Sequence, residues 1–418
     1  MQQQAPVTTS MSAPTSAPHP PPPIVSERRL AIVGAAMVAL GPISLALYTP
    51  AMPEIARAFG TTPAAVHLTL IAFFGGFAVA QLVCGPLSDA FGRKPVGLAF
   101  ICIYLVASVG AALAPGIDTL VAARLLQGIG AAAGIAVARA MVRDVFTGQA
   151  SARIMNMIGI MLAVGPAVSP ALGGLALHFA GWHSIFLIMV AYGLVLLVVL
   201  RTAVPETLAA RDPAKLAPRT LLRTYGGLLV DPTFMRPSLL IGFTVGGLYA
   251  LAVMMPFVMI DGLGLSPFLY GLAMLCQTAS YAFGGIVAQR LMRRVPADRL
   301  VPVGIATAAA AGAAVAFDLH VLPLSVPAVI LPVMLWAFGI ALIIPASQTA
   351  ALANVPTVAG AASALMGFIQ MASGFLAATA ASQFADQVTA LGTVLPAMAV
   401  IALLVYFGPG RRAAAAGR

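Results

Sequence analysis

Apolar residues run in long, almost uninterrupted stretches along most of the chain, and charged residues gather between them. Each stretch has about 20 residues, the length that an α-helix needs to cross a bilayer, and lacks the shorter alternating pattern of a membrane β-strand. The pattern therefore predicts an all-α membrane protein with twelve transmembrane helices, at 30–52, 65–86, 94–114, 118–141, 151–177, 182–202, 237–260, 267–289, 299–319, 324–345, 358–383 and 388–408.

A polar segment at 203–236 divides the spans six and six, and a short interfacial helix is expected within it at 219–229. We expect a first half at 28–202, a cytoplasmic linker at 203–236 and a second half at 237–408. A disordered Pro-rich tail precedes them at 1–27, and a basic tail follows at 409–418. The halves also echo each other, since Gly85, Arg93 and Lys94 recur as Gly285, Arg293 and Arg294. Two pseudo-symmetric six-helix bundles around a midplane site are typical of a secondary transporter.

Composition and charge narrow the class further. The 418 residues are 61% hydrophobic and 8% charged, against about 25% charged in soluble domains. Nineteen of the 22 Lys and Arg residues fall on the side of the spans that holds both chain ends. The positive-inside rule then places both termini in the cytoplasm and accounts for the net charge without a nucleic-acid partner.

Chemistry of other kinds has no support in the sequence. The three cysteines lie inside apolar runs and fit packing better than a disulfide framework or a metal site. A phosphate-binding loop and a nucleophile elbow are both absent. We therefore expect neither an enzyme nor a cofactor, and no metal.

The segment GPLSDAFGRK, at 85–94, concentrates charge between two apolar runs. Gly85 is expected to let two helices approach closely. Asp89 is placed to pair with an Arg or to face a helix N-terminus. Arg93 and Lys94, behind Gly92, hold the segment on the cytoplasmic side.

Two further motifs lie inside predicted spans. RLLQGIG places Arg124 in the membrane, where a charge is costly unless it faces water or a partner. No carboxylate shares its face closely, so we expect Arg124 and Gln127 to face a central cavity. Arg139 is nearer the cytoplasm and is expected to snorkel to the interface.

Span 5 is expected to be bent with a flat small-residue face. The residues of these motifs are Arg124, Gln127, Gly128 and Gly130 in span 4 and Gly159, Gly165, Pro166, Pro170, Gly173 and Gly174 in span 5.

These segments carry a family resemblance. GPLSDAFGRK resembles the loop 2–3 signature of the major facilitator superfamily, and the two span motifs resemble those of its drug:proton antiporters. YTPAMPEIA and ARAMVRDVF resemble the bicyclomycin/chloramphenicol-resistance (Bcr/CflA-like) branch. The resemblance implies a loop that latches the first half against span 11 in the outward-open state. It also implies a span-5 motif that seals the cavity against leak.

The proton carrier expected from that resemblance is not obvious. Every acid lies at a span end or in a loop, and Ala46 occupies the span-1 position where relatives commonly carry an acid. The candidates are His67, which titrates in the right range, and the rim acids Asp118, Glu54 and Asp261. The alternative for His67 is a hydrogen-bonded interfacial histidine.

The predicted function is export of small, neutral or weakly anionic, drug-like amphiphiles across the inner membrane by a monomer, driven by proton antiport. The alternatives are a facilitator or proton symporter for a metabolite, or a sensor on the same scaffold. The expected partners are the substrate, protons and the lipid bilayer. An aromatic and amide lining suits such substrates. The predicted cavity residues are Tyr48, Phe73, Phe77, Gln127, Asn156, Tyr249, Gln277, Tyr281, Trp336 and Gln370.

Overall fold

The computed structural model describes residues 24–355 and 358–408, and the regular structure in these ranges is helical. Twelve of the helices are long and apolar enough to cross a membrane, which confirms the predicted fold. The first half contains α1 (Glu27–Tyr48), α3 (Pro63–Phe91), α4 (Arg93–Ala112), α5 (Ile117–Val145), α6 (Gly148–Ala180) and α7 (His183–Ala203). The second half contains α9 (Pro232–Pro256), α10 (Pro267–Leu291), α11 (Leu300–Val321), α12 (Val326–Ala353), α13 (Ala359–Ala381) and α14 (Gln387–Phe407).

Several helices extend past their predicted ends. α3 continues to Phe91 and α5 to Val145, because helical hydrogen bonding persists after the apolar run has ended. The helix starts follow capping chemistry: the hydroxyl groups of Thr62 and Ser266 accept hydrogen bonds from Ala65 N and Leu269 N, both 3.2 Å away. A proline then occupies the first position of α3 and of α10, where a missing N–H costs nothing.

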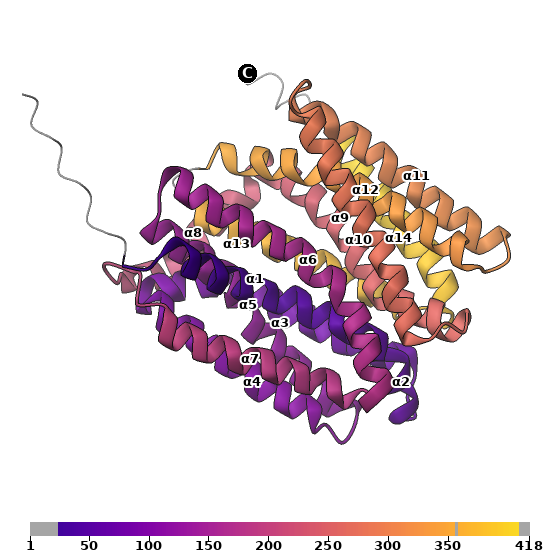
Figure 1. Cartoon of the computed structure of the whole chain (residues 1–418). Helices are drawn as coiled ribbons and strands as arrows, with labels where there is room; N and C mark the ends of the chain where they lie inside the picture. Colours follow the sequence, from indigo (N-terminus) through magenta and orange to yellow (C-terminus); the bar gives the residue numbers. More distant parts are fainter. Residues whose placement is uncertain (1–23, 356–357, 409–418) are drawn as a thin grey trace, which may run out of the picture.

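The bundle has two ends, which we name by their connections. The linker end holds the segment between α7 and α9 and the short connections after α3, α5, α10 and α12. The opposite end holds the short helix α2 (Met52–Ala58) and the π-helical turn η3 (Phe257–Gly262). Figure 1 shows the two halves as bundles that meet near α2 and diverge toward the chain ends.

The two halves are closed against each other at the opposite end. Arg57 Nη1 lies 2.7 Å from Asp261 Oδ1, and Tyr270 Oη donates to Thr49 Oγ1 at 3.3 Å. Gly174 of α6 packs so tightly on the main chain of α10 that a Cβ there would collide with the Pro267 carbonyl oxygen. The hydrophobic core of the first half also takes in Phe257 from the second half.

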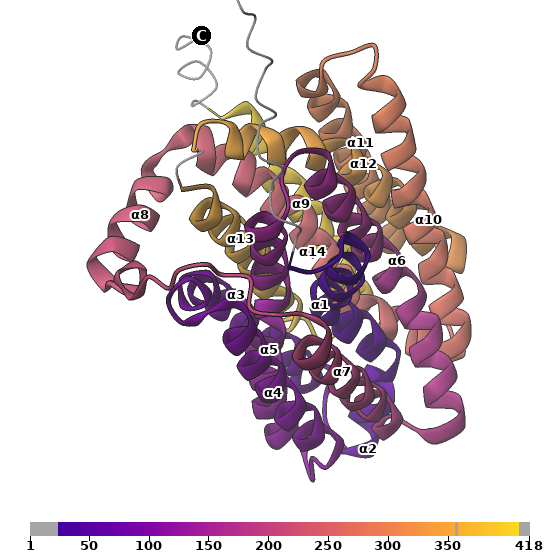
Figure 2. The same cartoon turned by 60° about the vertical axis from the view of Figure 1, so that its left-hand side comes forward.

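The linker contains the helix α8 (Pro218–Val230), which confirms the helix expected at 219–229, preceded by the turn η2 (Pro213–Leu216). Figure 2 shows α8 lying beside the bundle. Burial raises the pKa of Tyr225 to about 12, so its hydroxyl stays protonated and donates to Leu82 O of α3 at 2.7 Å. Asp212 N donates to Asp89 O at 3.1 Å. The linker therefore contacts the first half at several points.

Candidate functional site

A cavity of about 380 Å³ lies between the two halves and takes its lining from eight of the long helices. Near the linker end the lining includes Arg139 of α5, Gln348 of α12 and Ser363 of α13. The contacts of Arg57 and Tyr270 close the opposite end. The cavity is thus accessible from the linker end, the arrangement of one state of an alternating-access transporter.

The structure brings six of the predicted cavity residues together in this lining. They come from α3, α9, α10 and α13 and combine aromatic rings with amide groups. These six are Phe73, Phe77, Tyr249, Gln277, Tyr281 and Gln370. The side chain of Asn156 lies outside the described residues.

Three predicted cavity residues lie elsewhere, and for these the prediction is wrong. Trp336 is fully buried within the second half, where its Nε1 donates to Thr244 O at 3.3 Å. Tyr48 is also fully buried and shares a 2.8 Å hydrogen bond with Thr69. Gln127 donates to Ser108 Oγ at 2.7 Å. Each polar group finds its partner inside a half, so these side chains serve helix packing.

Arg124 is the clearest departure from expectation, because it does not face the cavity. Its side chain is fully buried, with the guanidinium carbon 4.5 Å from the centre of the Tyr48 ring and 4.4 Å from that of Phe73. Its Nη1 donates to Gln127 Oε1. Two aromatic faces and an amide oxygen stabilise this intramembrane charge.

The glycines of the same motif explain how α5 reaches this position. A Cβ at Gly128 would collide with the main chain of Phe73 in α3, and one at Gly130 with that of Tyr104 in α4. Such close approach is the known use of small residues between membrane helices. The span-4 motif therefore fixes the packing of three helices around Arg124.

Arg139 is the cavity cation that the sequence interpretation missed. It lies on the same helix as Arg124, lines the cavity and is half-buried, so the expected snorkelling to the interface is wrong. Both cations lie on a helix that is apolar on most of its faces, so periodicity could not tell which of them meets the cavity. The pocket lining drawn from the described residues contains no Asp or Glu.

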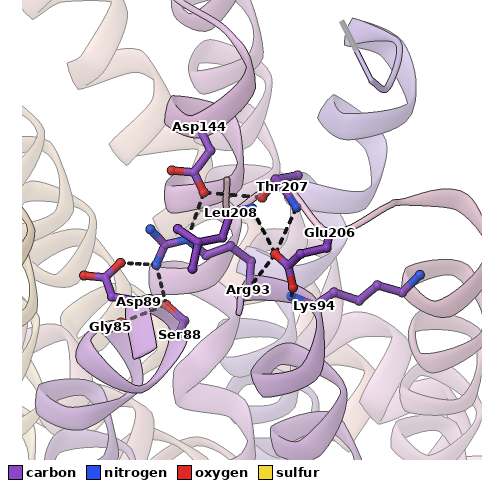
Figure 3. Close-up of polar contacts among 9 residues, drawn as sticks. All are labelled: Gly85, Ser88, Asp89, Arg93, Lys94, Asp144, Glu206, Thr207 and Leu208. Atoms are coloured by element: carbon purple, nitrogen blue, oxygen red, sulfur yellow. Dashed lines mark hydrogen bonds and ion pairs between the residues drawn. The ribbon is translucent and has the colours of Figure 1, made fainter. Parts of the chain in front are cut away.

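The charged segment at the end of α3 forms a compact network, shown in Figure 3. Arg93, only 7% exposed, pairs with Asp89 and donates from Nε to Asp144 Oδ2 at 2.9 Å and from Nη1 to Ser88 Oγ at 2.7 Å. Asp89 is in the last turn of α3 and Arg93 is the first residue of α4. The expected pairing of Asp89 with an Arg is therefore present, and Asp144 joins it.

Glu206 of the linker, which sequence reasoning missed, completes this network. Its carboxylate accepts hydrogen bonds from Arg93 N at 3.0 Å and from Lys94 N at 3.2 Å, so it caps the first turn of α4. An anion at this position also meets the positive end of the helix dipole. Gly92, with φ +109°, is the single residue between the helices, and a Cβ there would collide with Glu206.

Other expectations for this segment need correction. Gly85 does not mediate a close approach between the described helices, because none of their atoms lies within 4 Å of the position of its missing Cβ. Lys94 donates from Nζ to Arg201 O at the end of α7, at 2.7 Å. In the second half the echo is weak: Arg293 and Arg294 are exposed in the turn after α10.

The span-5 motif divides into packing and lining positions. Pro166 and Pro170 line the cavity. Gly173 packs on the main chain of Leu47, and Gly165 on the side chain of Ile43. No atom lies within 4 Å of the Cβ position at Gly159 among the described residues.

The proton-coupling candidates lie at the opposite end, outside the cavity lining. His67 is fully buried, and neither ring nitrogen has a partner in the described part of the chain, so the interfacial alternative is wrong. Its ring packs edge-on against Phe257, with 5.3 Å between the centroids. Glu54 accepts a hydrogen bond from Trp182 N at 3.1 Å, Asp261 pairs with Arg57, and Asp118 is exposed. Over the described ranges no group of His, Cys, Asp and Glu is arranged to hold a metal.

A two-half helical bundle closed at one end around a cavity defines the class of polytopic membrane transporters. The model of the Major Facilitator Superfamily matches residues 34–378, and the chain belongs to this family of membrane transporters.

Relatives and solved structures agree with that assignment. The chain is 33% identical to "Uncharacterized MFS-type transporter YdgK" of Bacillus subtilis, over 91% of this chain and 94% of that protein. It is 25% identical to "Bicyclomycin resistance protein homolog" of Haemophilus influenzae, over 88% and 92% of the two chains. A crystal structure of a D-xylose–proton symporter has the same fold, with a TM-score of 0.73 and 14% identity over 91% and 97% of the two chains. The chain is thus a transporter with antibiotic-resistance relatives, and not an enzyme.

Proposed function

We propose that this transporter exports small amphiphilic compounds, neutral or weakly anionic, from the cytoplasm. The observation that carries the proposal is the cavity, which presents aromatic rings and unpaired amide groups and draws no carboxylate from the described residues. Such a lining suits uncharged and weakly acidic drug-like molecules. The relative named for bicyclomycin resistance supports the same class of substrate.

The proposed orientation puts the linker end in the cytoplasm of the inner membrane. The excess of Lys and Arg at that end supports it through the positive-inside rule. In this orientation the structure is the inward-facing state, ready to receive a substrate from the cytoplasm. A monomer suffices for this cycle, because one chain supplies both halves.

We propose proton antiport as the driving reaction and His67 as the proton carrier. His67 lies against Phe257, at the contact between the halves that must open for release. Opening this end would expose the imidazole to water, where it titrates near neutral pH. The charged ring is disfavoured in an apolar contact, so antiport requires that closure of this end drives the proton from His67 toward the cavity and the cytoplasm.

An uncoupled facilitator is the second candidate, favoured by the lack of an Asp or Glu among the described lining residues. Purified protein in proteoliposomes distinguishes the two. An imposed pH gradient should drive chloramphenicol uphill for an antiporter, whereas a facilitator equilibrates it at the same rate with or without the gradient. The export proposal would be contradicted if the protein moved neither chloramphenicol nor any of a panel of other neutral amphiphiles, with or without the gradient.

A further inference from the structure

Arg139 presents a guanidinium to the transport cavity without a partner from the protein. In the described part of the chain it forms neither a hydrogen bond nor an ion pair, and no Asp or Glu from that part lines the cavity around it. Another cation, Arg143, lies one helical turn further along α5 and repels it electrostatically. A charge in a largely apolar site is costly unless a counter-charge compensates it.

Other unpaired donors lie in the same cavity. Gln348 and Ser363 line it near the linker end, and Gln277 and Gln370 line it deeper. None of these four makes a hydrogen bond within the described residues. Amide and hydroxyl donors together with a guanidinium suit an oxyanion, because each can donate to its oxygen atoms.

The lining is also sorted by depth. Arg139 is six residues before the end of α5 at Val145, about 9 Å along the axis from the linker end at 1.5 Å per residue. Phe77 is fourteen residues before the end of α3 at Phe91, about 21 Å from the same end. The charge thus lies near the mouth and the aromatic rings lie deeper. A ligand of matching shape has an acidic head and an apolar, aromatic body.

From this arrangement we infer that Arg139 binds the acidic group of an organic monoanion, a carboxylate or sulfonate, whose aromatic body lies against Phe73, Phe77 and Tyr249. This inference rests on the proposed function and narrows its substrate class from neutral or weakly anionic amphiphiles to aromatic acids. It also moves the charge-selecting role from Arg124, which is buried inside the first half, to Arg139.

Three fluorescent probes with a common aromatic body test the site: dansylglycine, an anion; dansylamide, which is neutral; and dansylcadaverine, a cation. Binding to the purified full-length transporter is followed by dansyl fluorescence. Wild type should bind dansylglycine about tenfold or more tightly than dansylamide, the range expected for hydrogen bonds to a charged group. Dansylcadaverine should bind more weakly than either.

Substitution then assigns the preference to one residue. Arg139→Gln should bind dansylglycine and dansylamide within about twofold of each other, with dansylamide affinity unchanged. Arg139→Lys should keep part of the preference, since it keeps the charge but loses the planar fork. Arg143→Gln is the matched control, because Arg143 is exposed one turn away on the same helix, and it should shift dansylglycine binding by less than about threefold.

The result that overturns the inference is equal binding of dansylglycine and dansylamide by wild type, or an equal loss of both in Arg139→Gln. If Arg139→Gln aggregates, the anion site is tested instead with Arg139→Lys and with the salt dependence of wild-type binding. Added salt should weaken the binding of dansylglycine and leave the binding of dansylamide unchanged. The same salt dependence for both probes would count against the site.

Export from vesicles separates this inference from the proposed function. Equal export of dansylglycine and dansylamide by wild type and Arg139→Gln would refute the anion site and leave the exporter standing. If the binding preference depends on Arg139 but neither the probes nor chloramphenicol are exported, the anion site stands and the proposed export function is refuted.

Discussion

The carboxylate of Glu206 lies within hydrogen-bond distance of the main-chain amides of both Arg93 and Lys94, at 3.0 and 3.2 Å. It also accepts hydrogen bonds from Thr207 N and Leu208 N, so the start of the linker folds around its own side chain. A residue outside the recognised motif therefore fastens the linker to the connection between α3 and α4.

Glu206→Ala should loosen the linker. The change removes a helix cap of about 1 kcal/mol and the contacts that fold residues 206–208. Trypsin should then cut at Arg211 several times faster than in wild type. Glu27→Ala, which breaks the exposed pair with Arg153, is the control and should leave that cleavage rate unchanged. An equal rate in both variants would show that Glu206 does not hold the linker.

Transport should be more sensitive to changes in the Arg93 network than to a change at the neighbouring Lys94. Arg93→Ala leaves two partly buried carboxylates without their cation, a change that costs about 3–5 kcal/mol for a buried pair. Asp89→Asn should insert normally but lose most transport, because it weakens the same pairing. Lys94→Ala should do less harm, since the Lys94 side chain makes a single hydrogen bond, and its main-chain bond to Glu206 survives the change. Efflux at matched expression ranks the three, and near-normal efflux by Asp89→Asn contradicts the assignment.

His67→Gln tests the proposed coupling. Transport should lose its dependence on an imposed pH gradient while substrate binding stays within about twofold, because His67 lies outside the cavity lining. His178→Gln, a histidine exposed near the end of α6, is the control and should keep the wild-type gradient response. An unchanged response in His67→Gln returns His67 to a packing role and directs attention to Glu54 and Asp118.

Arg124→Met should destabilise the first half without changing which probes bind. The guanidinium between Tyr48 and Phe73 contributes two cation–π contacts, each about 1–2 kcal/mol when desolvated. The thermal unfolding midpoint should therefore fall, and the relative affinities for dansylglycine and dansylamide should stay. A loss of anion preference in Arg124→Met would show that Arg124, and not Arg139, selects charge.

The closed end offers a conformational test. Arg57→Cys with Asp261→Cys places one thiol on each half at the position of their ion pair, and a reducible bis-methanethiosulfonate cross-linker that spans the lost side chains should lock the linker-end-open state. Binding of dansylamide should persist and export should stop, with recovery on reduction. Each single cysteine variant is a control that should export under both conditions. Continued export by the cross-linked double variant would mean that this end need not open.

Hydropathy predicted the twelve spans, since a continuous apolar run of helix length has few other structures open to it. Cavity residues were predictable only where the spacing along a single helix places them on the same face. Phe73 and Phe77 lie one turn apart on α3 and both line the cavity. Arg124 and Arg139 were assigned to the wrong surroundings, because the choice depends on how α5 packs against α1, α3 and α4. Glu206 and Asp144 meet Arg93 only through tertiary contacts, although the acid in ARAMVRDVF was a usable signal.

The attachment of the linker has a consequence for chain entropy. Glu206, Asp212 and Tyr225 tie the linker to the first half, and Leu228 of α8 lies in the hydrophobic core of the second half, so little free chain remains between the halves. A long free linker would lose configurational freedom whenever the halves came together, by an amount that grows with the logarithm of its length. In this protein the linker loses that configurational freedom once, when the chain folds. Each rocking movement then has little further linker chain to order, and the free-energy difference between the two states is left to the helix contacts and the substrate.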